Sequence, residues 1–130
     1  MEFLPLVYLT ILLSLVQFLY FTLRAGITRG KYKIDAPNTT GNETWERIFR
    51  VQQNTMEQLI MFIPGILLFA HYVSPKWALV PGVLFIIGRQ IFSHLYVNNP
   101  PKRAPGMALS MLSNVTLILG SIVGIILELI

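Results

Sequence analysis

Three polar side chains near the middle of the chain could together bind a small charged molecule. Arg50, Asn54 and Glu57 are spaced at i, i+4 and i+7, which places them on one face of a helix. The guanidinium can pair with a carboxylate, the carboxylate can receive an ammonium group, and the amide can bond to either. This set suits a zwitterionic ligand. The alternative is that Arg50 and Glu57 neutralise each other inside the protein.

A second set, Arg89, Phe92 and Tyr96, has the spacing i, i+3 and i+7, and Arg89 lies within an otherwise apolar stretch. A charge at membrane depth is costly, so it normally faces a bundle interior, a cavity or a bound ligand. Arg89 could instead extend to the membrane surface, and Tyr96 could be an interfacial aromatic residue. His71 and His94 belong to opposite sides of the membrane, with no cysteine or carboxylate cluster nearby, so we expect no metal.

The basic pair Lys102 and Arg103 follows two prolines before the last apolar stretch. A rigid turn there could hold one cation at a fixed depth beside the polar face of residues 50–57. The same pair could equally anchor the chain to phospholipid headgroups. The residues alone leave both interpretations open.

Composition indicates a single membrane-embedded domain over residues 1–130, since 54% of them are hydrophobic and only 12% are charged. The stretch Phe3 to Leu23 has no charge and lacks the features of a signal peptide, so we expect a retained first helix. The net charge of +4 is spread over short loops and helix ends, which argues against nucleic acid as a partner. With no cysteine in the chain, any thiol chemistry must use the thiol of a substrate.

Hydropathy predicts an all-α, integral membrane bundle of four helices with up-down-up-down topology. The apolar run 59–72 would reach only about 21 Å as a helix against a hydrocarbon core of roughly 30 Å, so its helix must include the polar residues before it. Turn formers and prolines separate the helices. The four predicted helices are residues 3–28, 43–72, 75–96 and 105–129.

Charge asymmetry predicts the orientation, because most lysines and arginines flank the first and third loops while Lys76 stands alone on the other side. We therefore expect these loops to face the cytoplasm and both termini to lie on the opposite side. The polar residues of the second helix would then open toward the cytoplasm. A bacterial inner membrane and the endoplasmic reticulum both fit this multi-pass topology.

Three segments together resemble the MAPEG family, the membrane-associated proteins in eicosanoid and glutathione metabolism. They are PNTTG at 37–41, ERIFRVQQNTME at 46–57 and YVNNPPKR at 96–103. Within the family, the microsomal glutathione S-transferases and leukotriene synthases are the most similar. The resemblance implies a homotrimer that holds glutathione, as co-substrate, at each subunit interface, in a site open to the cytosol.

The resemblance also implies roles for single residues. Arg103 matches the catalytic arginine, which would stabilise the glutathione thiolate, while Arg29 and Gln52 would reach the ligand from the adjacent subunit. Gln58 and Phe92 stand where many relatives carry tyrosine, so two ligand hydroxyls are absent. The expected glutathione-binding residues are Arg29, Arg50, Gln52, Asn54, Glu57, Gln58, Arg89, Phe92 and Tyr96.

The function expected from this resemblance is conjugation of glutathione to lipophilic electrophiles, with glutathione-dependent reduction of lipid hydroperoxides as a further activity. One alternative is a lipid-binding scaffold without catalysis, of the lipoxygenase-activating type. Another is a small multidrug transporter. The transporter would need a carboxylate in its first helix, where the sequence has no acidic residue beyond Glu2.

Overall fold

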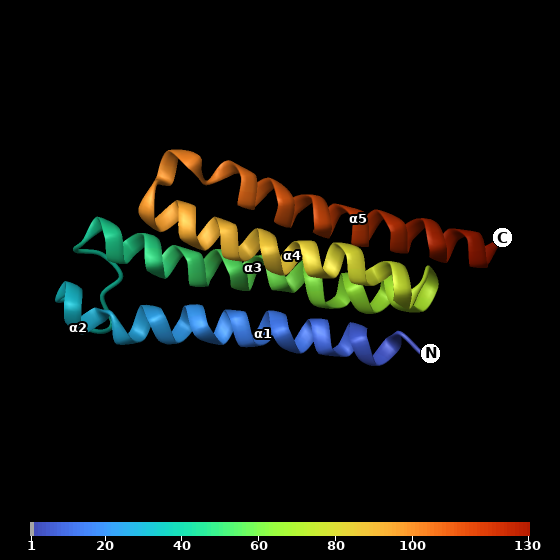
Figure 1. The fold of residues 1–130 in the computed structure, drawn as a ribbon, viewed down its shortest axis with the longest axis horizontal. Helices are drawn as coiled ribbons and strands as arrows, with labels where there is room; N and C mark the ends of the chain where they lie inside the picture. The colour runs from blue at the N-terminus through green and yellow to red at the C-terminus, as the bar shows by residue number, and fades with distance from the viewer. Residues whose placement is uncertain (1) are drawn as a thin grey trace.

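Four long helices run antiparallel in the computed structural model, which describes residues 2–130 (Figure 1). Each is long and apolar enough to cross a membrane, and the described residues contain no strand. The predicted fold class is therefore confirmed, and the predicted helix ends differ from the observed ones by at most two residues. The long helices are α1 (Leu4–Ile27), α3 (Glu43–Tyr72), α4 (Pro75–Asn98) and α5 (Ala104–Leu129).

Two short helical turns were not predicted. Helix α2 (Arg29–Tyr32) continues from α1 after Thr28, and Lys33 caps its end with a left-handed φ of 57°. The 3-10 turn η1 (Pro100–Lys102) fills the proline-rich connection before α5. Both turns lie at the end of the bundle that is opposite the two termini (Figure 1).

The starts of α3 and α4 are fixed by side-chain caps. The Asn42 Oδ1 accepts a hydrogen bond from the Trp45 amide at 3.0 Å, and Glu43 and Glu46 add negative charge to the first turn. At the start of α4, the Ser74 hydroxyl accepts from the Trp77 amide at 3.2 Å. These local contacts explain why the two predicted starts agree with the structure.

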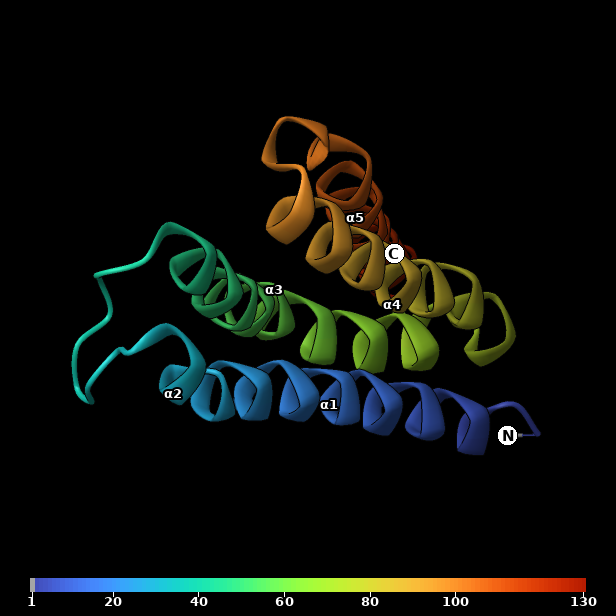
Figure 2. The same cartoon turned by 60° about the vertical axis from the view of Figure 1, so that its left-hand side comes forward.

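Helices α3 and α4 form the centre of the bundle, with α1 on one side and α5 on the other (Figures 1 and 2). Two apolar clusters fill the interior. The larger one, toward the termini, includes the stacked rings of Phe62 and Phe85, whose centroids are 4.0 Å apart. The smaller one, toward the end that holds α2 and η1, consists of Phe21, Ala25, Ile48, Val51, Phe92 and Val97.

Helices α4 and α5 approach closely where two glycines face each other. A Cβ built on Gly106 would lie 2.8 Å from the carbonyl oxygen of Gly88, and one on Gly88 would lie 2.9 Å from the backbone nitrogen of Ser110. The backbones are thus nearly in contact. This approach brings α5 side chains within reach of the middle of α4.

Candidate functional site

A buried arginine lies between the two apolar clusters. Arg89 of α4 has 0% of its surface exposed. Its Nε donates to the Ser110 hydroxyl of α5 at 2.9 Å, and one terminal nitrogen donates to the Asn54 Oδ1 of α3 at 2.6 Å. The guanidinium also lies 4.6 Å from the centre of the Phe92 ring. One side chain therefore links the three helices.

Arg89 does not extend to the membrane surface, so that alternative for it was wrong. Its partners Ser110, Thr55 and Met107 were missed by the sequence analysis. Thr55 accepts from Arg89 at 3.4 Å, and the Met107 sulfur lies 3.7 Å from the second terminal nitrogen. The sequence contains only an indirect indication of these partners. An arginine inside an apolar span requires hydrogen-bond acceptors, and short hydroxyl residues on neighbouring spans can supply them.

The outward face of α3 carries the first predicted set. Arg50 and Glu57 are exposed, while Asn54 and Gln52 are half-buried. Neither Arg50 nor Glu57 has a hydrogen-bond or ion-pair partner among residues 2–130, so the two do not neutralise each other within the chain. The face directed at the bundle interior is instead formed by Trp45, Ile48, Val51, Thr55, Gln58 and Leu59.

Gln58 is directed into the bundle. Only 5% of its surface is exposed, and its side-chain oxygen accepts from Asn114 of α5 at 2.9 Å. Asn114 also donates to the Gln58 backbone oxygen at 3.3 Å. Within one chain, Gln58 thus connects α3 to α5, and its contact with glutathione stays a prediction.

Phe92 and Tyr96 continue outward from Arg89 along α4. The two rings are stacked with centroids 5.1 Å apart, Phe92 buried and Tyr96 half-buried. The Arg89 guanidinium and the two rings therefore form one column on the predicted face of α4. The column runs from the bundle interior toward the loops, and its outermost member is the one that a ligand could reach.

Arg29 is held by its own chain. One terminal nitrogen donates to the Asn38 backbone oxygen at 2.7 Å, and the guanidinium lies 4.6 Å from the centre of the Trp45 ring. Trp45 is itself fixed, because its indole nitrogen donates to the Ala25 backbone oxygen at 3.0 Å. Arg29 is only partly exposed, and its exposed part is where the predicted contact with a neighbouring subunit would have to occur.

Arg103 lies at one end of an open, mostly apolar groove on α5. Its side chain is exposed and donates to the Pro100 backbone oxygen at 3.2 Å. The groove has a volume of about 490 Å³. It is lined by Pro101, Arg103, Ala104, Met107, Ala108 and Met111. A cation beside an apolar surface can stabilise an anion that reacts with a lipophilic molecule.

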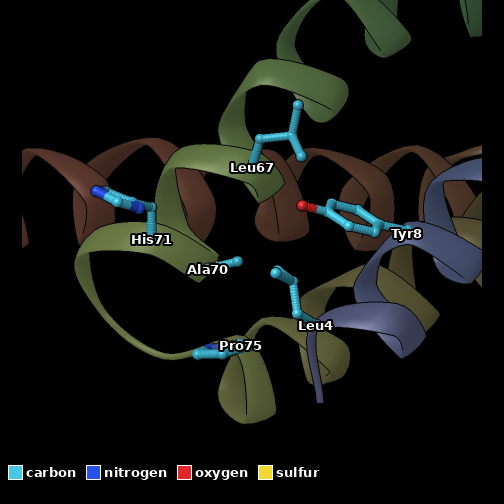
Figure 3. Close-up of a pocket in the computed structure, with 6 residues that line it drawn as sticks. All are labelled: Leu4, Tyr8, Leu67, Ala70, His71 and Pro75. Carbon is cyan, nitrogen blue, oxygen red and sulfur yellow. The ribbon is translucent and has the colours of Figure 1, made fainter. Parts of the chain in front are cut away.

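A second cavity, of about 370 Å³, lies at the other end of the bundle (Figure 3). It is lined by Leu4, Tyr8, Leu67, Ala70, His71 and Pro75. Figure 3 shows the Tyr8 hydroxyl directed into this space and the His71 ring directed away from it. Pro75 is the first residue of α4, at the end of the bundle that holds the termini, so this cavity is separate from the end that holds Arg29, Arg50 and Arg103.

The fold and these residues define a helical multi-pass membrane protein with a polar site near one end of its spans. Comparison with known proteins identifies the family within this class. The MAPEG family profile matches residues 3–123, and the chain belongs to this family, as the resemblance predicted.

Relatives include the human protein named microsomal glutathione S-transferase 2, which is 36% identical over 77% of this chain and 68% of its own length. The mouse protein of the same name is 38% identical over the same shares. An uncharacterised protein of Synechocystis sp. is 39% identical over 90% of this chain and 85% of its own length.

Proposed function

We propose that this protein is a membrane-bound glutathione transferase that conjugates glutathione to lipophilic electrophiles. The names of the human and mouse relatives support the choice of glutathione. The observation that carries the proposal is the outward polar face of α3, where Arg50 and Glu57 are exposed and have no partner among residues 2–130. Opposite charges at this spacing match a peptide that carries both an ammonium group and carboxylates.

Assembly would complete the site. Charged side chains that face lipid are costly, so the exposed face of α3 favours a second copy of the chain as its cover. In the proposed homotrimer, glutathione lies between this face and a neighbouring subunit, which contributes Arg29 and Gln52. Tyr96, at the outer end of the aromatic column, borders the same site. The basic residues of the loops at this end favour the cytoplasmic side for it.

Arg103 would stabilise the reacting thiolate. A free thiol has a pKa of about 8.5, and lowering it to about 6.5 requires roughly 2.7 kcal/mol of preferential stabilisation of the anion. Arg103 is exposed in the single chain, and once the bound ligand and the neighbouring subunit of the proposed trimer shield it from water, its guanidinium can supply this amount. The thiol proton passes to solvent, and the sulfur is left as the nucleophile.

The groove beside Arg103 would hold the electrophile. Its methionines are flexible and tolerate apolar molecules of different shapes. With a chlorinated aromatic compound, the thiolate forms a carbon–sulfur bond and chloride leaves with the bonding electrons. With a lipid hydroperoxide, two glutathione molecules give the disulfide, the alcohol and water. Each reaction balances with glutathione as the only co-substrate.

Two measurements on purified protein test the proposal. The first is glutathione-dependent conjugation of a chlorinated aromatic electrophile. The second is an ultraviolet difference titration with glutathione, in which a thiolate band should form with the parent and be largely lost in Arg103→Ala. Lys102→Ala removes an adjacent exposed cation and is the matched control, so its band should remain. A band that persists in Arg103→Ala and disappears in Lys102→Ala would assign the role to Lys102.

A lipid-binding scaffold without catalysis is the second candidate. The apolar lining of the groove on α5 favours it, because such a surface could hold a lipid without any reaction. The two functions differ in two readouts. A scaffold would show no glutathione-dependent turnover and no thiolate band, although it would still bind lipid.

A further inference from the structure

The contact between Arg89 and Asn54 fixes which atom of the Asn54 amide faces inward. An arginine side chain donates hydrogen bonds and cannot accept them. The Asn54 atom that lies 2.6 Å from the Arg89 terminal nitrogen must therefore be the carbonyl oxygen. This follows from the chemistry of the pair alone.

Arg89 has little freedom to release this contact. Its Nε donates to the Ser110 hydroxyl at 2.9 Å, and that hydroxyl donates in turn to the Gly106 backbone oxygen at 2.9 Å. The guanidinium is also packed against the Phe92 ring and is fully buried. Rotation of Arg89 would leave a buried charge without acceptors, which is strongly unfavourable.

The other end of the Asn54 amide is consequently a donor. Asn54 is half-buried, and its Nδ2 makes no hydrogen bond among residues 2–130. Arg50 lies one turn before it and Glu57 one turn after it on the same face. Along this face Arg50 and Asn54 are then hydrogen-bond donors, and Glu57 is an acceptor.

We propose that Arg89 is a positioning residue that makes Asn54 a donor-only contact, so that the part of the site beside Arg50 takes a carboxylate of the ligand. This rests on the proposed function. The ammonium group is excluded from Asn54 and goes to Glu57, the acceptor of the three. Arg50 and Glu57 already give this face opposite charges at its two ends, and Arg89 reinforces the direction in which a zwitterionic peptide lies along α3 by fixing the amide between them.

Asn54→Asp tests the proposal directly. The aspartate still offers Arg89 an oxygen, and its second oxygen replaces the Nδ2 donor. We expect the thermal midpoint in detergent to be unchanged or higher, while the dissociation constant for glutathione rises about tenfold or more. Gln53→Glu makes the same amide-to-acid change at the neighbouring residue and is the matched control, with an expected change of less than about twofold.

A change of ligand separates positioning from a general loss of structure. Two glutathione analogues are used, each with one carboxylate converted to a primary amide. The parent should prefer free glutathione, whereas Asn54→Asp should prefer one of the two amides, because an amide can donate to the new carboxylate. The analogue that shows this reversal identifies the carboxylate that lies at Asn54.

Arg89→Gln provides an independent readout. Glutamine can accept as well as donate, so the Asn54 amide is free to turn. We expect the KM for glutathione to rise several-fold while kcat at saturating glutathione stays within about twofold. A loss confined to kcat would contradict positioning, and if this variant does not fold, the analogue reversal in Asn54→Asp decides alone.

Unchanged glutathione affinity in Asn54→Asp, or equal weakening for glutathione and both amides, would overturn the proposal. That outcome differs from failure of the proposed function. If the parent itself takes up no glutathione by calorimetry at millimolar concentration, the transferase assignment falls and the positioning role falls with it.

Discussion

Gly106→Ala should separate the two helices that hold Arg89. The new Cβ would lie 2.7 Å from the Phe92 Cα and 2.8 Å from the Gly88 carbonyl oxygen. Carbon atoms in contact prefer about 3.5–4.0 Å, so α4 and α5 must move apart by roughly 1 Å. Backbone atoms cannot rotate out of the way, in contrast to a flexible side chain.

The cost has two parts. Overpacking costs about 1–3 kcal/mol. The shift also lengthens the 2.9 Å bond from Arg89 to Ser110, and a hydrogen bond to a charged group contributes about 1.5–3 kcal/mol. Allowing for partial relaxation, we expect a loss of about 3 kcal/mol, or roughly 10 °C in the thermal midpoint at this chain length.

Thermal unfolding in detergent, followed by circular dichroism, measures this effect. Gly26→Ala is the matched control, because a Cβ there meets no atom within 4 Å and alanine favours the helix by up to about 1 kcal/mol. Its midpoint should stay the same or rise. A midpoint for Gly106→Ala within roughly 2 °C of the parent would refute the close contact of α4 and α5.

Two further variants probe the outer face and a helix end. Glu57→Gln should raise the dissociation constant for glutathione about tenfold by calorimetry. Its thermal midpoint should be unchanged, since Glu57 has no partner among residues 2–130. A lowered thermal midpoint in this variant would contradict the prediction. Asn42→Ala removes the cap on the Trp45 amide and should cost about 1 kcal/mol of stability. For that variant, an unaltered midpoint would show that the cap is dispensable.

Much of the fold could be predicted from local sequence. Three apolar stretches are long enough to be spans by themselves, and the fourth, 59–72, reaches that length with the polar residues before it. Each predicted helix is ended by turn formers or prolines that cannot continue it. The polar face at 50–57 also follows from helical spacing alone. The turns α2 and η1 were missed because single turns carry no periodic signal.

What the sequence could not decide was which polar side chain faces inward. Three polar residues lie in or beside apolar spans, yet they differ in exposure. Arg89 is buried, Asn54 is half-buried and Glu57 is exposed. The acceptors that keep Arg89 inside lie 21 and 35 residues away, on other helices.

Four apolar helices, their order and the polar face of α3 follow from local properties, hydropathy and spacing along one helix. The packed bundle was needed to show that Arg89 is held by Ser110 and Asn54, and that Gln58 is turned toward Asn114. A buried donor needs an acceptor within about 3 Å, and such partners meet only when the helices pack together.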